Sequence, residues 1–182
     1  MRVVFSLCLS LLLFNASAQK KKVREDYFQQ EVQYSIDVKL DDENHTLTGF
    51  ERLVYINRSP QTLSQLYFHL WPNAYRNNET ALAKQLLENG ETAMHFANPQ
   101  GELGFIDSLQ FIVNKDTIRW EYDSTHMDIA VLHLNKLLKP GDTAIITTPF
   151  FVKLPSSFSR LGHVDQSYQI TQWYPKPAVF DR

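Results

Sequence analysis

The chain has 182 residues, of which 43% are apolar, 21% are charged and 13% are aromatic, and its net charge is −2 at pH 7. This length corresponds to about one domain, and the ordinary composition argues against a disordered, collagen-like or coiled-coil protein. The near-neutral charge argues against a nucleic-acid-binding protein, which needs a basic surface. The many aromatic residues favour β structure, because rings pack well on pleated sheets.

The first 18 residues are typical of a secretory signal peptide. A positive start is followed by an apolar run over residues 3–14, and residues 16–18 have the small side chains of a signal-peptidase site. The apolar run is too short to span a membrane, which takes roughly 20 residues. We therefore expect cleavage between Ala18 and Gln19, and an exported protein without a transmembrane segment after cleavage. Its final location would be the periplasm, the cell surface or the medium.

Cys8, the only cysteine, lies inside this apolar run rather than after it, which argues against a lipid-modified N-terminal cysteine. Loss of the signal peptide would leave a chain without cysteine, and so without disulfides or a thiolate zinc site. Residues 19–30 begin with a charged stretch that has few apolar side chains, and we expect them to form a flexible leader.

Alternation of apolar and polar residues predicts a series of strands. Residues 32–40 alternate throughout, and a polar turn joins them to a returning strand over residues 45–57. A second hairpin is predicted to join residues 105–113 to residues 117–122. Single strands are predicted over residues 63–70, 128–134, 143–154 and 168–173, and the apolar run 128–134 is expected to be buried on both faces.

One helix is predicted over residues 79–88, with Asn78 as its N-cap and Gly90 beyond its end. With about eight strands and one helix, the expected fold is mostly β. We predict an antiparallel saddle-like sheet or sandwich with one short helix, and residues 31–182 as a single β domain.

Most catalytic motifs are missing from the sequence. It has no G-x-G-x-x-G or P-loop motif for phosphates, no G-x-S-x-G nucleophile motif and no H-E-x-x-H zinc motif. His126 and His133 would lie roughly 23 Å apart on an extended strand, so they cannot share a metal. We expect each histidine to be a polar side chain at a sheet edge or turn, and we expect no catalytic or metal-binding residue in these 182 residues. The histidines are His45, His69, His95, His126, His133 and His163.

After the expected signal peptide, three Asn-x-Ser/Thr triplets begin at Asn44, Asn57 and Asn78. Such triplets accept glycans only in a host that glycosylates them and only on the surface of the protein. Their polar composition predicts that these three turns face the solvent.

Several stretches, in this order and spacing, resemble the N-terminal β domain of aminopeptidase N-like (gluzincin) zinc metallopeptidases. Residues 34–40 with 47–51 resemble the opening hairpin of that domain, in which L-x-G-x-E follows the first strand. Residues 137–143 are similar to its L-x-P-G-(E/D) turn, and residues 170–175 are similar to its T-Q segment. Residues 66–75 are similar to an exported bacterial branch of the family.

The resemblance implies a non-catalytic part of an exported metallopeptidase. Full-length members join this domain to a thermolysin-like domain, whose H-E-x-x-H motif and distant Glu bind Zn²⁺ that polarises the peptide carbonyl and activates water. This chain has no such motif, so zinc is expected only in that catalytic domain, which would pack on this one. The β domain would form one wall of the peptide-substrate cleft. There Gln172 would help to hold the free amine of the substrate through its carbonyl oxygen.

The chain departs from the family after Gln172. Residues 173–181 read W-Y-P-K-P-A-V-F-D instead of the F-P-C-x-D of many members, which argues against the family's aminopeptidase specificity more than against its scaffold. Because the sequence ends just after this segment, the resemblance predicts a β domain truncated at its C-terminal end. The alternative is a stand-alone exported β-sandwich that binds a protein or a glycan. The reading frame beyond Arg182 distinguishes the two.

Overall fold

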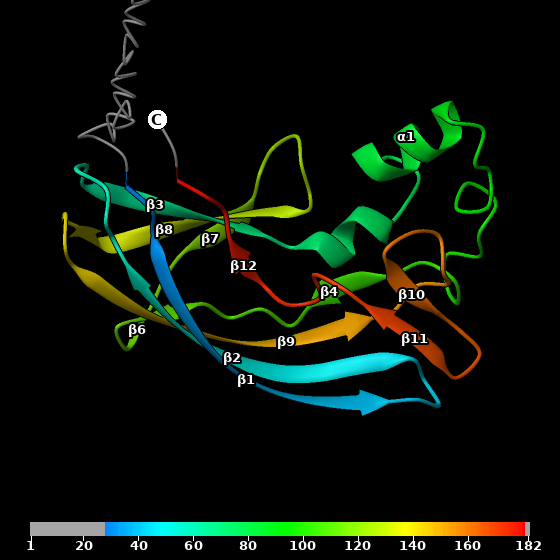
Figure 1. The fold of residues 1–182 in the computed structure, drawn as a ribbon, viewed down its shortest axis with the longest axis horizontal. Helices are drawn as coiled ribbons and strands as arrows, with labels where there is room; N and C mark the ends of the chain where they lie inside the picture. The colour runs from blue at the N-terminus through cyan, green and yellow to red at the C-terminus, as the bar shows by residue number, and fades with distance from the viewer. Residues whose placement is uncertain (1–27, 181–182) are drawn as a thin grey trace, which may run out of the picture.

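The computed structural model describes residues 28–180 (Figure 1). The expected signal peptide, its cleavage site and most of the expected leader fall on residues 1–27 and so lie outside the described residues. Among residues 28–180, no helix has both the length and the apolar character that crossing a membrane would require.

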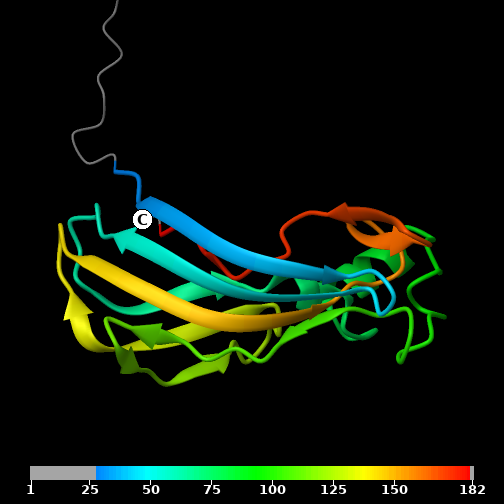
Figure 2. The ribbon, with the colours of Figure 1, turned by 90° about the horizontal axis from the view of Figure 1, so that it is seen from below.

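The first sheet is built on three long antiparallel strands, β1 (Glu31–Asp41), β2 (Thr46–Ile56) and β9 (Thr143–Lys153). Its order is β1-β2-β9-β5-β6, with the short strands β5 (Ile112–Val113) and β6 (Asp116–Thr117) at one side. Another short strand, β4 (Phe105–Asp107), also pairs with β9. The expected strands over residues 32–40, 45–57 and 143–154 are therefore confirmed. Figure 2 shows the long curve of β1, β2 and β9.

The second sheet has the order β12-β3-β8-β7. Its main strands are β3 (Leu63–His69) and β8 (Ile129–Leu138), flanked by β12 (Lys176–Pro177) and β7 (Trp120–Tyr122). The expected strands over residues 63–70 and 128–134 are confirmed, and three successive residues of β8, residues 130–132, are buried.

The core lies between the two sheets. Leu53 of β2 and Ile146 of β9 face Phe68 of β3 and Leu132 of β8, and all four are at most 1% exposed. Burial of apolar area at about 25 cal/mol per Å² is the main contribution that holds such layers together. The fold prediction is thus confirmed: the described residues form a mostly β, antiparallel sandwich with a curved sheet and one α-helix.

The L-x-G-x-E motif has a packing role on the inner face of the first sheet. A Cβ atom at Gly49 would clash with the ring of Phe150, so only glycine lets this ring lie against β2. Two residues further on, Glu51 is 2% exposed and lies opposite Ile36 of β1 and Thr148 of β9. The motif therefore places a carboxyl group inside an apolar layer.

Three smaller elements lie at one end of the sandwich (Figure 1). They are the 3₁₀ helix η1 (Trp71–Tyr75), the helix α1 (Ala81–Glu88), and a separate hairpin of β10 (Leu161–Val164) and β11 (Ser167–Ile170). The predicted helix is confirmed, but its predicted N-cap is wrong. Thr80, not Asn78, caps α1, because its hydroxyl oxygen accepts a hydrogen bond from the backbone N–H of Ala83 at 3.2 Å.

The predicted second hairpin is confirmed only beside its turn, where β5 pairs with β6, and it is wrong for the rest of residues 105–122. Residues 105–107 pair with β9 of the first sheet, and residues 120–122 pair with β8 of the second. Between them, Phe111 is fully buried, and its ring centroid lies 5.3 Å from that of Phe68 and 5.5 Å from that of Trp120. Burial of this ring between the sheets therefore takes precedence over local pairing, and the segment crosses from one sheet to the other.

The prediction that all three Asn-x-Ser/Thr turns face the solvent is wrong for Asn57. Asn44 and Asn78 are exposed, whereas Asn57 is fully buried. Its amide nitrogen donates to the carbonyl oxygens of Gln61 at 2.7 Å and Leu138 at 3.0 Å. A buried amide must find such partners, and here they come from two separate segments.

Candidate functional site

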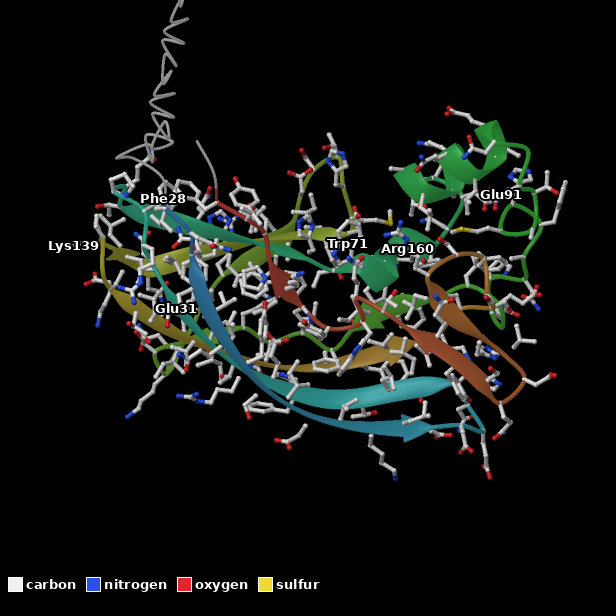
Figure 3. The ribbon with its side chains drawn as sticks, in the orientation of Figure 1. Phe28, Glu31, Trp71, Glu91, Lys139 and Arg160 are labelled. Atoms are coloured by element: carbon white, nitrogen blue, oxygen red, sulfur yellow. The ribbon has the colours of Figure 1, made fainter. Side chains whose placement is uncertain are left out.

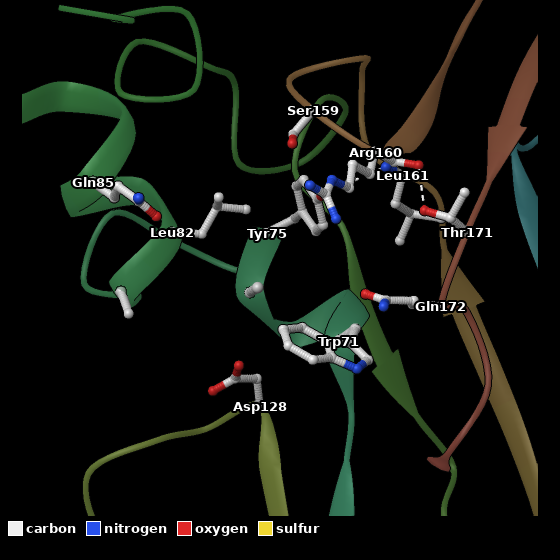
Figure 4. Close-up of a pocket in the computed structure, with 12 residues that line it drawn as sticks. Trp71, Tyr75, Leu82, Gln85, Asp128, Ser159, Arg160, Leu161, Thr171 and Gln172 are labelled. Atoms are coloured by element: carbon white, nitrogen blue, oxygen red, sulfur yellow. Dashed lines mark hydrogen bonds between the residues drawn. The ribbon is translucent and has the colours of Figure 1, made fainter. Parts of the chain in front are cut away.

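A pocket of about 420 Å³ opens at the end of the sandwich that carries α1 and the β10–β11 hairpin. Figure 3 shows Trp71 and Arg160 at this end, away from Phe28 and Lys139 at the other. Four segments form the wall: η1, α1, the residue before β8, and the two ends of the hairpin (Figure 4). The residues that matter most for its chemistry are Trp71, Tyr75, Leu82, Asp128, Arg160 and Gln172.

Asn73, in η1, organises the floor of the pocket. It is fully buried, its amide nitrogen donates to the carbonyl oxygen of Met127 at 3.0 Å, and its amide oxygen accepts from the backbone N–H of Ile106 at 3.1 Å. Next to it, the backbone N–H of Leu70 donates to the carbonyl oxygen of Asp128 at 2.7 Å. These bonds fix η1 against the start of β8, and so place the Trp71 ring beside the Asp128 carboxylate (Figure 4).

Helix α1 supplies the opposite wall through Leu82 and Gln85. The helix is attached to the floor by its cap, because the Thr80 hydroxyl donates to the carbonyl oxygen of Ala74 at 2.7 Å. Ala83 and Leu86 face the core, which leaves Leu82 half-buried at the pocket.

The remaining wall consists of the residues just before β10 and just after β11. The Thr171 hydroxyl donates to the carbonyl oxygen of Arg160 at 2.6 Å, which closes this end of the hairpin. Strand β11 was predicted to continue to Trp173 but ends at Ile170. The reason is Gln172, whose φ of +52° lies in the left-handed region and turns the chain away. This conformation costs a non-glycine residue free energy and is found preferentially at functional sites.

The structure places Gln172, the one residue predicted to bind substrate, in the wall of this pocket. Its side chain is exposed and its amide points into the pocket, without a hydrogen bond to the other residues drawn in Figure 4. The amide oxygen is thus available as an acceptor for a ligand, and the amide nitrogen as a donor.

Two opposite charges accompany this amide. Asp128 is half-buried and Arg160 is exposed, and neither forms an ion pair within residues 28–180. His69 stacks on Trp71 with ring centroids 4.9 Å apart. Burial lowers the pKa of His69, and the nearby carboxylate of Asp128 only partly opposes this, so the imidazole is neutral at pH 7. The pocket therefore combines apolar walls with one anion, one cation and two amides, those of Gln85 and Gln172, which suits binding of a polar, charged ligand.

His126 and His133 bond to two different carboxylates. His133 contacts Glu121 through Nε2 at 2.9 Å and Gln65 through Nδ1 at 3.0 Å, whereas His126 lies in a turn against Asp123. Among residues 28–180, no three His, Cys, Asp or Glu side chains come together as possible metal ligands. The described residues thus offer no donor set that fits zinc, and we assign no step through a metal to them.

Sequence reasoning missed Trp71, Asp128 and Arg160 as pocket residues. Trp71 lies in the 66–75 stretch, directly after the predicted strand over residues 63–70, and no motif marks it as a pocket residue. Asp128 and Arg160 follow no motif, and tertiary structure alone brings them to the pocket.

No protein-family model matches the chain, and a comparison with curated proteins finds no significant match. Function must therefore be argued from the pocket and from the sequence resemblance.

Proposed function

We propose that this chain is the N-terminal β domain of an exported aminopeptidase N-like zinc metallopeptidase, and that its pocket forms one wall of the peptide cleft. In this role the chain binds the amino-terminal residue of a peptide and performs no hydrolysis itself. The peptide bond would be hydrolysed by a separate zinc domain, which would pack on this end of the sandwich.

One observation carries the proposal. Gln172, chosen from the T-Q resemblance alone, lies in a pocket of about 420 Å³ with a left-handed backbone and its amide directed inward. A left-handed backbone at a non-glycine residue is typical of functional positions, and an exposed amide can exchange its hydrogen bonds with water for hydrogen bonds with a ligand. The apolar part of the peptide's amino-terminal residue would lie against Trp71, Tyr75 and Leu82. Its ammonium group would be attracted by the carboxylate of Asp128.

The test is a titration of the purified chain with trialanine and with N-acetyl-trialanine, followed by amide chemical shifts in NMR. We expect trialanine to bind and to shift the signals around Trp71, Arg160 and Gln172. Acetylation removes the positive charge, so the acetylated peptide should bind at least about tenfold more weakly, as is typical of a lost charge-assisted hydrogen bond.

The matched variants are Gln172→Ala and Gln169→Ala. Gln169 is exposed on β11 but does not line the pocket, so its replacement should leave binding unchanged. Gln172→Ala should weaken trialanine binding about tenfold. Equal binding of the two peptides, or equal behaviour of the two variants, would contradict a role of Gln172 in amine recognition.

The metallopeptidase part of the proposal has its own test. The reading frame after Arg182 in the gene should encode H-E-x-x-H and a downstream Glu. A stop codon shortly after Arg182 would contradict the metallopeptidase, and would favour the stand-alone β-sandwich that binds a protein or a glycan.

A further inference from the structure

The β10–β11 hairpin connects the wall of the pocket to a distant turn of the first sheet. One end of it carries Arg160 and the other carries Gln172, both in the pocket wall. Its far end lies against the turn between β1 and β2, which is distant in sequence (Figures 1 and 2). Contacts at this far end therefore help to set the position of the pocket wall.

The main contact at the far end is a pair of stacked histidines. His45, from the β1–β2 turn, and His163, from β10, have ring centroids 3.6 Å apart and planes inclined by 17°. Tyr168 of β11 completes the cluster, with its hydroxyl 2.8 Å from Nδ1 of His45 and donating to the carbonyl oxygen of Asp42 at 3.2 Å. A second link from the hairpin, Gln166 Nε2 to the same carbonyl oxygen at 3.4 Å, is longer.

The surroundings of His163 disfavour its protonation. Its Nε2 is buried and has no hydrogen-bond partner among the described residues. Burial lowers the pKa of His163, and His45 and the ammonium group of Lys153 on β9 lower it further, while Asp165 in the hairpin turn opposes them. The other charged groups near the cluster are Asp41 and Asp42, which act on Tyr168 from the β1–β2 turn.

Low pH should therefore destabilise the arrangement in which His45 and His163 are stacked, which we call the closed state. When the hairpin is detached, the imidazole of His163 is solvated and binds a proton with the ordinary histidine pKa near 6.5. In the stack, two positive charges would face each other across 3.6 Å, so the closed state binds fewer protons. The closed state is then stable above pH 6.5 and loses stability as the pH falls below this value.

We propose that the stacked imidazoles of His45 and His163 form an acid-sensitive contact. This contact holds the turn end of the β10–β11 hairpin against the β1–β2 turn, and so helps to position one wall of the pocket. Backbone hydrogen bonds of His163 with Pro155 at 3.0 Å and Ser157 at 3.1 Å hold β10 independently of the imidazoles. A protonated His163 ring would leave its cluster with His45 and Tyr168, so acid should loosen β11 and the hairpin turn, while β10 keeps these backbone bonds. This proposal is independent of the ligand that the pocket binds.

The test measures hydrogen exchange of the amides of residues 165–172, the hairpin turn and the strand β11 with its end, at pH 7 and pH 5, corrected for the intrinsic exchange rate. We expect protection to fall on the order of tenfold at pH 5, because the detached hairpin takes up a proton that the stack excludes. NMR titration of the ring signals should place the pKa of His163 below 6.5. A pKa of 6.5 or above, or protection that does not change with pH, would overturn the proposal.

The matched variants are His163→Phe and His126→Phe. Phenylalanine keeps a ring in the stack without a charge, and it removes a buried nitrogen that has no partner within residues 28–180. His163→Phe should abolish the loss of protection at pH 5, whereas His126→Phe, in a distant turn, should retain it. The same loss in His163→Phe as in the wild type would overturn the proposal. If His163→Phe does not fold, the pKa of His163 in the wild type decides alone, and a value of 6.5 or above would overturn the proposal.

Discussion

Glu51 is the residue least expected from its surroundings, because it is a carboxyl group in an apolar layer. One of its oxygens, Oε2, is buried without a hydrogen-bond partner among the described residues. Burial raises its pKa to about 8, so the side chain is mainly neutral at pH 7. The same burial raises the pKa of Tyr34 above its ordinary value, and the nearby Tyr174 and Glu51 add to this effect. The inner face of the first sheet thus tolerates a neutral acid but not its charged form.

This residue makes a definite prediction for stability. Between pH 4.5 and pH 8 the folded state holds a proton on Glu51 that the unfolded chain has lost, so the free energy of unfolding should fall across this range and change no further above it. Because a tenfold change in proton affinity is worth about 1.4 kcal/mol, we expect a fall of several kcal/mol. Urea unfolding of the wild type and Glu51→Gln at pH 5 and pH 9 isolates the contribution. An identical change with pH in both proteins would contradict it.

Among the elements, Asn57 joins the end of β2 to the connection before β3 and to the end of β8. Besides its two donated bonds, its amide oxygen accepts from the Ser59 hydroxyl at 2.7 Å and from the Ser59 backbone N–H at 3.1 Å. Asn57→Ala would leave several of these buried groups without partners, and we expect the free energy of unfolding to fall by about 2–4 kcal/mol. Urea unfolding measures this. The control is Asn78→Ala, at an exposed residue, which should change the free energy of unfolding by less than about 0.5 kcal/mol. Equal effects of the two variants would show that the buried network contributes little.

The elements also differ in how well the sequence predicts them. The long strands β1, β2, β3, β8 and β9 carry enough residues for apolar periodicity to show, and all were predicted. The short strands β10 and β12 were missed, because pairings of two to four residues have no periodicity of their own. The burial of Asn57 was missed because its partners are 4 and 81 residues away along the chain. The pocket could be predicted only at Gln172, since its other residues come together through tertiary packing.

At the scale of the whole molecule, residues 171–180 connect the pocket, the first sheet and the second sheet. Directly after Gln172, the ring of Trp173 packs 5.8 Å from that of Phe150, and the ring of Tyr174 packs 5.3 Å from that of Tyr34. The segment then joins the second sheet as β12, where Pro177 lies opposite Phe68. The two layers and the pocket are therefore linked by one short stretch of chain.

Trp173→Ala tests whether this stretch holds the molecule together. Trp173 is half-buried, so loss of its ring should lower the free energy of unfolding by about 2–3 kcal/mol, less than for a fully buried aromatic residue. Because Gln172 precedes it, the same variant should also weaken trialanine binding without removing any pocket-lining side chain.

Val179→Ala is the control, since Val179 is 88% exposed and its loss should change stability by less than about 0.5 kcal/mol. Chemical denaturation and the peptide titration give the two measurements. A loss of stability with unchanged binding would mean that the Gln172 backbone keeps its position without Trp173, and that the packing of this segment and the geometry of the pocket are independent.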